Sequence, residues 1–334
     1  MAVSLDGCLW DNGKSLRVFS TDFPERKVLD IDPFLFFSIT WATTGGKAHM
    51  RGFNREDLLA YLERCRMPDG GYCSFHDPES GAGFSNVADT CFCLSAFRLL
   101  GGEIPELSKT RSFILQVLST DGLHRQSPYL SWALESKLLA GLPLSGEEGQ
   151  LLRKETVRLL SAKGSWIEQS DLVGEIARLM NVRLLSGLPP EQEEIGPLSA
   201  LIRDSPELPT ILELSDLALL SGLLPGGRRV STSERLYRHP SLGYVLVPGS
   251  SRSDLFILLA GLRLREEPLD SGEILRFRIR VLFCQGLGGG FGPVGGARPT
   301  LEATRAALEI LSLLSDESLG QNAGSGIVGN GKKA

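Results

Sequence analysis

MPDGGYCSFHDPESGAGFSNVADTCFCLSAFRLLGG spans Met67–Gly102, and a shorter version returns at Cys284–Leu314 as CQGLGGGFGPVGGARPTLEATRAALEILSLL. In both copies a Gly-Gly-aromatic turn is followed by a Gly/Pro loop, a polar cap ending in Thr, and an apolar segment of helical length. A shared order of this length indicates an internal repeat, and each copy is expected to be one structural unit.

Outside these copies, amphipathic and apolar segments alternate every ~40 residues, which is typical of stacked αα-hairpins. The segment from Asn54 to Arg66 is amphipathic and predicts an outer helix, whereas the apolar helix that opens at Asp89-Thr90 has no polar face and must be buried. Ser170, Ser215 and Ser253 each precede Asp-Leu and an apolar run, so we expect further inner helices to begin there.

The hairpins are expected to form one helical domain over residues 34–316. Residues 1–33 mix polar and β-branched side chains and predict an irregular arm with a short strand, while FLFFSITWAT from Phe34 predicts a buried helix. Residues 317–334 lose the core-forming residues and predict a disordered tail.

Composition excludes several classes of function. The chain of 334 residues carries a net charge of -5, which gives no basic footprint for nucleic acid. There is no signal-peptide pattern and no apolar run of transmembrane length, so we expect a cytoplasmic protein without a transmembrane segment. Four of the six cysteines fall within one repeat, which favours reduced thiols or metal ligands over a disulfide framework.

The GGF and GGY turns, the Asp-Thr and Glu-Ala-Thr caps and the Arg-Leu-Leu-Gly ending resemble the prenyltransferase and squalene-oxidase repeat over residues 34–316. The resemblance implies an all-α fold, an (α/α)6 toroid similar to protein prenyltransferase β subunits and terpene cyclases. Inner-helix N-termini would meet at one mouth and favour a diphosphate, and the apolar interior would suit an isoprenoid. The leading hypothesis is transfer of a prenyl group from a prenyl diphosphate to an acceptor, together with a helical α-type subunit.

A zinc site is implied by the same resemblance. Asp89-Thr90-Cys91 has the Asp-x-Cys spacing of the transferase zinc ligands at an inner-helix start, and His124 lies in the following hairpin. Zinc would lower the pKa of the acceptor thiol. However, the preceding SGAGFSNVA lacks the basic residues that the family places there, and Asp89 and Cys91 also fit a capping acid and a small core residue.

A terpene cyclase is the alternative, working without metal or with magnesium. Such cyclases open an inner helix with Asp-x-Asp-Asp-Thr, but here Ala88 stands where the proton-donating acid is expected. Another acid at the mouth would have to replace it, with Asp171, Asp216 and Asp254 as candidates, each of which also fits a helix cap or first-turn acid. A third reading is a non-catalytic isoprenoid-binding or scaffold toroid.

Candidate substrate-binding residues lie near hairpin turns and inner-helix starts. Aromatic rings there suit an isoprenoid or a carbocation and also suit an ordinary core. The aromatic candidates are Tyr129, Trp132, Trp166, Tyr244 and Phe291, and the basic candidates for the mouth are Arg98, Arg111, Arg125 and Arg252.

Overall fold

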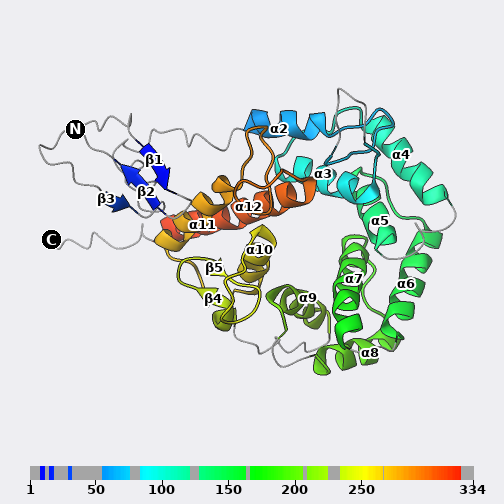
Figure 1. The fold of residues 1–334 in the computed structure, drawn as a ribbon. Coiled ribbons are helices and arrows are strands. Elements are labelled where there is room, and N and C mark those ends of the chain that lie inside the picture. Colours follow the sequence, from blue (N-terminus) through cyan, green and yellow to red (C-terminus); the bar gives the residue numbers. More distant parts are fainter. Residues whose placement is uncertain are drawn as a thin grey trace, which may run out of the picture.

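The computed structural model describes residues 8–11, 15–18, 29–31, 55–75, 83–120, 128–162, 166–205, 209–224, 234–265 and 267–324. For the described residues within 8–31, 166–171 and 316–324, it describes only the backbone. The described residues are mostly helical (Figure 1), as expected of an all-α protein. None of the described helices is both long and apolar enough to cross a membrane.

Helices of two kinds alternate along the chain. The inner helices are α3 (Val87–Leu99), α5 (Tyr129–Leu139), α7 (Trp166–Leu185), α9 (Ile211–Gly222), α10 (Leu255–Leu264) and α12 (Leu301–Gly324). The outer helices are α2 (Arg55–Arg64), α4 (Leu107–Ser119), α6 (Gly146–Leu160), α8 (Gln192–Arg203) and α11 (Ser271–Phe283).

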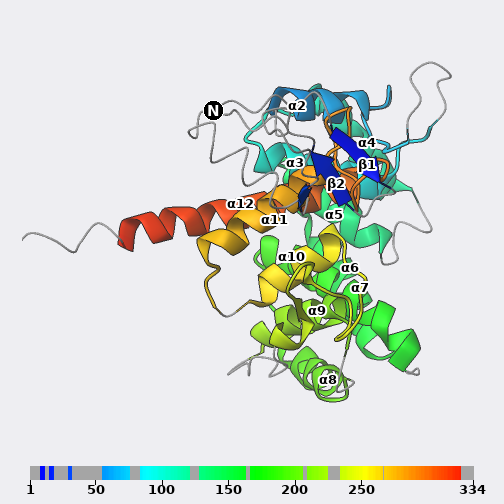
Figure 2. The same ribbon diagram turned by 60° about the vertical axis from the view of Figure 1, so that its left-hand side comes forward.

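The inner helices contact one another in a closed circuit. Each packs on the next in chain order, and α12 packs on both α10 and α3, so the last inner helix meets the first (Figure 1). The far end of α12 projects beyond the other helices (Figure 2). The circuit brings residues from distant parts of the sequence to one central space.

The two sequence copies have the same hydrogen bonds around a threonine side chain, so each is one structural unit. The amide of Tyr72 donates to Thr90 Oγ1 at 3.1 Å, and the amide of Phe291 donates to Thr304 Oγ1 at 3.0 Å. Each threonine hydroxyl in turn donates to the carbonyl four residues earlier at 2.7 Å. The threonine in each copy therefore ties the aromatic turn to the first turn of the inner helix.

The glycine turns of the two copies also pack in the same way. Gly70 and Gly289 both have φ of +94°, which L side chains rarely adopt. A Cβ on Gly70 would lie 2.4 Å from the carbonyl carbon of Lys109 in α4, and one on Gly289 would lie 2.4 Å from the carbonyl oxygen of Asp57 in α2. The first turn thus packs on the next outer helix, and the last turn packs on the first outer helix.

Several predicted boundaries were wrong. Helices α7 and α9 begin at Trp166 and Ile211, so Ser170 and Ser215 lie inside helices. Helix α9 begins before Ser215 because Thr210 is its N-cap and forms a capping box with Glu213. The prediction was right for α10, whose N-cap Asp254 follows Ser253 and accepts from the amide of Ile257 at 2.9 Å.

The fifth hairpin has no described outer helix. Its place is taken by the 3-10 helix η2 (Glu234–Tyr237) and a two-stranded hairpin of β4 (Arg238–His239) and β5 (Gly243–Tyr244). Pro240 and Gly243 explain the change, because proline and glycine both disfavour a helix interior. The sequence had predicted only that this segment leads into an inner helix.

The two ends of the chain also contain more regular backbone than expected. Strands β1 (Cys8–Asp11), β2 (Ser15–Val18) and β3 (Leu29–Ile31) form an antiparallel sheet within the arm. Helix α12 continues to Gly324, eight residues past the expected end of the helical domain at 316. The helix predicted from Phe34 lies outside the described residues.

Candidate functional site

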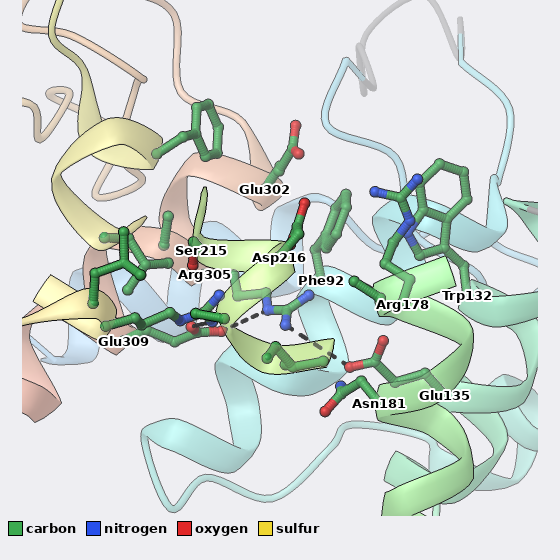
Figure 3. Close-up of a pocket in the computed structure, with 18 residues that line it drawn as sticks. Phe92, Trp132, Glu135, Arg178, Asn181, Ser215, Asp216, Glu302, Arg305 and Glu309 are labelled. Carbon is green, nitrogen blue, oxygen red and sulfur yellow. Dashed lines mark hydrogen bonds and ion pairs between the residues drawn. The ribbon is translucent and has the colours of Figure 1, made fainter. Parts of the chain in front are cut away.

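A cavity of about 680 Å³ lies at the centre of the circuit and is lined by residues of all six inner helices. This central pocket combines aromatic and charged side chains (Figure 3). Its aromatic and charged lining residues are Phe92, Trp132, Glu135, Arg178, Asp216, Phe256, Arg263, Glu302, Arg305 and Glu309. Its volume falls within the ~300–1,000 Å³ range of small-molecule sites.

An ion-pair network crosses one part of the pocket. Arg305 Nε donates to Glu309 Oε1 at 2.8 Å, and its Nη2 lies 3.9 Å from Glu135 Oε1. Arg263 also pairs with Glu309. Burial opposes the charge of Arg305, but Glu309 and Glu135 outweigh it and raise its pKa. Arg263 and Arg305 are therefore already neutralised by protein carboxylates.

Asp216 is held differently. It lies half-buried in the second turn of α9, and one carboxyl oxygen faces Gly174 of α7. Within the described part of the chain, no hydrogen bond or ion pair ties down its carboxyl group. Burial raises its pKa from 3.8 to about 6, although Arg178 and Arg263 act in the opposite direction. This carboxyl group therefore takes up a proton more readily than an exposed aspartate.

Arg178 and the aromatic rings form the neighbouring wall. The Arg178 guanidinium lies 5.8 Å from the centre of the Trp132 ring, and its Nε is buried without a hydrogen-bond partner. Trp132 meets Phe92 edge-on, with ring centres 6.2 Å apart. On the far side of Phe92, Arg305 lies 5.7 Å from the ring centre. The wall thus already holds cations against aromatic faces.

The predicted zinc residues lie in different environments. Asp89 is at the first turn of α3, where its carboxylate accepts from the amide and hydroxyl of Ser74, both at 2.7 Å, and from Asn86 Nδ2 at 2.8 Å. Cys91 is fully buried, and burial, reinforced by Glu135, raises the pKa of its thiol. His124 lies outside the described residues. In the described ranges, no group of three His, Cys, Asp or Glu is placed to hold a metal.

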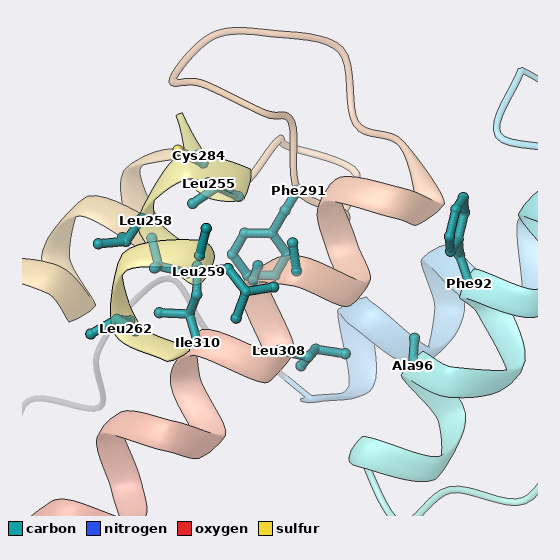
Figure 4. Packing of buried hydrophobic residues seen from close by; sticks show 14 of the residues in the cluster. Phe92, Ala96, Leu255, Leu258, Leu259, Leu262, Cys284, Phe291, Leu308 and Ile310 are labelled. Atoms are coloured by element: carbon teal, nitrogen blue, oxygen red, sulfur yellow. The ribbon is translucent and has the colours of Figure 1, made fainter. Parts of the chain in front are cut away.

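Among the predicted aromatic residues whose side chains the structure describes, one lines the central pocket. That residue is Trp132, and Tyr129, which is partly exposed, packs on it with ring centres 5.9 Å apart. Tyr244 and Phe291 are fully buried. Phe291 fills the aromatic position of the second repeat copy, and Figure 4 shows it within the packed cluster of α10 and α12. The side chain of Trp166 is outside the described residues.

Of the predicted basic residues, the three that the structure describes do not line the pocket. Arg98 is exposed in the last turn of α3, Arg252 is exposed in the loop before α10, and Arg111 Nε donates to the Ala140 carbonyl at 2.9 Å. Arg125 lies outside the described residues.

Of the three candidate acids, Asp216 reaches the pocket and Asp254 caps α10. For Asp171 the structure describes only the backbone, within α7.

Sequence reasoning did not single out Arg178, nor the charged residues of α12. A usable signal was present, because Glu302, Arg305 and Glu309 follow one another at helical spacing in Leu301–Leu314, where the other residues are apolar apart from Thr304 and Ser312. Charges on one stripe of a buried helix must face a partner or a cavity.

No family model matches the sequence, and no curated protein shows a significant match to it.

Proposed function

We propose that the chain is an (α/α)6 toroid that binds an isoprenoid in the central pocket and cyclises it by proton donation from Asp216. The closed circuit of six inner helices supports the toroid, as does the packing of the last glycine turn on α2. The observation that carries the chemistry is the untethered carboxyl group of Asp216 in a cavity with three aromatic side chains, Phe92, Trp132 and Phe256.

The charges of the pocket favour a cationic intermediate over a bound diphosphate. Among the described lining residues there are four acids and three arginines, and two of those arginines are paired with Glu309. A diphosphate would face a surplus of carboxylates with only Arg178 outside an ion pair. Carboxylates and aromatic faces instead stabilise a positive charge that develops nearby.

The chemical step needs only groups that the chain supplies and an alkene. The O–H bond of protonated Asp216 breaks as the π electrons of a terminal alkene form a C–H bond, which leaves a tertiary carbocation. The next double bond of the same chain attacks this cation and closes a ring. The final cation loses a proton to solvent, and Asp216 regains a proton from solvent, so the reaction is an isomerisation.

Prenyl transfer to an acceptor thiol is the competing proposal. It rests on the Asp89-x-Cys91 spacing, and it requires zinc, a prenyl diphosphate and, by resemblance, an α-type subunit. A fully buried Cys91 thiol with a raised pKa is a poor starting point for a zinc ligand, since zinc binds the thiolate. Zinc analysis of wild type and Cys91→Ser separates the proposals, because only transfer predicts about one zinc per chain that the substitution removes.

The decisive experiment is turnover of squalene, as an acyclic probe without a diphosphate, in deuterated buffer. We expect a cyclic isomer that carries one deuterium at the carbon protonated first. Asp216→Asn should lower the rate by roughly 10²–10⁴-fold, the usual contribution of a general acid. Asp204→Asn, which removes an exposed acid at the end of α8, is the matched control. Equal turnover by wild type and Asp216→Asn would rule out the proposed acid.

A non-catalytic toroid predicts a different result. Squalene would then bind but remain unchanged, with similar affinity in wild type and Asp216→Asn.

A further inference from the structure

A second cavity, of about 390 Å³, lies away from the central pocket between the β4–β5 hairpin and α11. Its walls come from residues 238–244 on one side and from one face of α11 on the other, where Glu273, Arg276, Phe277 and Arg280 follow helical spacing. We call this cavity the rim pocket. It shares no lining residue with the central pocket.

Three arginines line the rim pocket against one acid. The positive charge of Arg238 is offset by two carboxylates, because its Nη2 donates to the buried Glu234 at 2.9 Å and its Nη1 lies 3.8 Å from Glu273. Arg276 and Arg280 form no ion pair with any described residue. The local excess of positive charge therefore belongs to these two arginines on α11.

The hydrogen bonds of these two side chains leave donors unused. Arg276 is exposed, and among the described residues it reaches only the Pro240 carbonyl, at 3.5 Å, which is the long limit of a hydrogen bond. Arg280 Nη2 donates to Ser253 Oγ at 2.6 Å, while its Nη1 is buried without a partner. Burial lowers the pKa of Arg280, although Cys284 and Asp254 act in the opposite direction.

His239 adds a third donor. The amides of Ser241 and Leu242 donate to its Nδ1 at 3.3 and 3.2 Å, so Nδ1 carries no proton and the neutral ring is protonated at Nε2. Two guanidinium groups and an imidazole N–H on facing walls match the several oxygens of a tetrahedral anion.

We propose that the rim pocket binds a phosphate group, free or as a monoester, between Arg276 and Arg280 with His239 as a further donor. A phosphate there supplies the counter-charge that α11 lacks and accepts from the unused guanidinium donors. The proposal is independent of the chemistry in the central pocket, because the two pockets share no lining residue.

The test is calorimetric titration with inorganic phosphate at constant ionic strength set by chloride. Wild type should bind one phosphate per chain saturably, and Arg276→Gln and Arg280→Gln should each weaken binding about tenfold or more, the cost of losing a charge-assisted hydrogen bond. Arg278→Gln is the matched control, since this arginine lies on the same helix but donates to the Leu314 carbonyl at 3.1 Å. Arg276 is exposed, so its variant tests the site even if Arg280→Gln folds poorly.

The outcomes distinguish free phosphate from a phosphate monoester, and they test the rim-pocket proposal separately from the cyclase proposal. Tighter binding of glycerol 3-phosphate than of inorganic phosphate would identify a monoester as the ligand, and equal affinities would identify free phosphate. Asp216→Asn should bind phosphate as wild type does, whether or not the cyclase proposal holds. Absence of saturable binding, or equal affinity in wild type, Arg276→Gln and Arg280→Gln, would overturn the rim-pocket proposal.

Discussion

Replacing Asp216 with Asn should stabilise the protein at neutral pH. Burial raises the pKa of Asp216 from 3.8 to about 6, so its ionised form is less stable in the folded chain than in the unfolded chain. The difference is about 2 pKa units, and at about 1.4 kcal/mol per unit the ionised carboxylate costs up to about 3 kcal/mol. Asn has nearly the same shape and no charge, so the substitution removes this cost.

The sign of the pH dependence follows from the same shift. The folded-state pKa is raised, so the stability contributed by the neutral carboxyl group is fully present below 3.8 and is lost as the pH rises through about 6. The gain from Asp216→Asn should therefore be near its maximum of about 3 kcal/mol at pH ~7, and only about 1 kcal/mol at pH ~4.5.

Urea denaturation followed by circular dichroism measures this difference at both pH values. Asp204→Asn controls for the loss of one negative charge, because that carboxylate is exposed. A gain that is the same at both pH values, or no gain at neutral pH, would refute the claim that burial holds Asp216 in an unfavourable charged state. The stability measurement is independent of any substrate and stands apart from the cyclase proposal.

Two further substitutions test the closed circuit, and a labelling experiment tests the buried thiol. Gly289→Ala should lower the free energy of unfolding by about 3 kcal/mol or more, because the new Cβ would meet the Asp57 carbonyl. Gly296→Ala is the control: Gly296 has φ of +77° but no atom within 4 Å, so this variant should lose only about 1–2 kcal/mol from backbone strain. Equal losses in thermal denaturation would contradict the packing of the Gly289 turn. Ser74→Ala should lower stability by about 1–3 kcal/mol, because the hydroxyl joins the amide of Leu301 to the first repeat, and unchanged urea denaturation would argue against this link. Cys91 should resist iodoacetamide in the folded protein and react only after unfolding, as followed by mass spectrometry, whereas rapid labelling of the native chain would show that the thiol is accessible.

The repeat units could be predicted from the sequence because their turns depend on residues with few alternatives. Positive φ at Gly70 and Gly289 demands glycine, and the hydroxyls of Thr90 and Thr304 satisfy the amides of the aromatic turn, so the same letters recur in both copies. Where the turn is built differently, as in the β4–β5 hairpin, the pattern weakens and the sequence did not predict the loss of the outer helix.

The site was harder to predict because it depends on helix rotation. Asp216 was one of three acids that sequence placed at helix starts, but the cap at Thr210 begins α9 earlier and turns Asp216 toward the centre from within the helix. Asp254, with the same Ser-Asp-Leu motif, remains a cap. The motif alone cannot separate the two, since the difference arises from residues one turn upstream.

The closure of the circuit sets the order in which a growing chain can complete its pocket. The amide of Leu301 reaches Ser74, a partner 227 residues earlier, and α12 supplies one wall of the cavity. During synthesis the first five hairpins precede α12, so the part of α3 that packs on α12 stays uncovered until nearly the whole chain has left the ribosome. Contacts between such distant residues slow folding, and apolar surface that stays uncovered in the meantime is the kind of surface that chaperones bind.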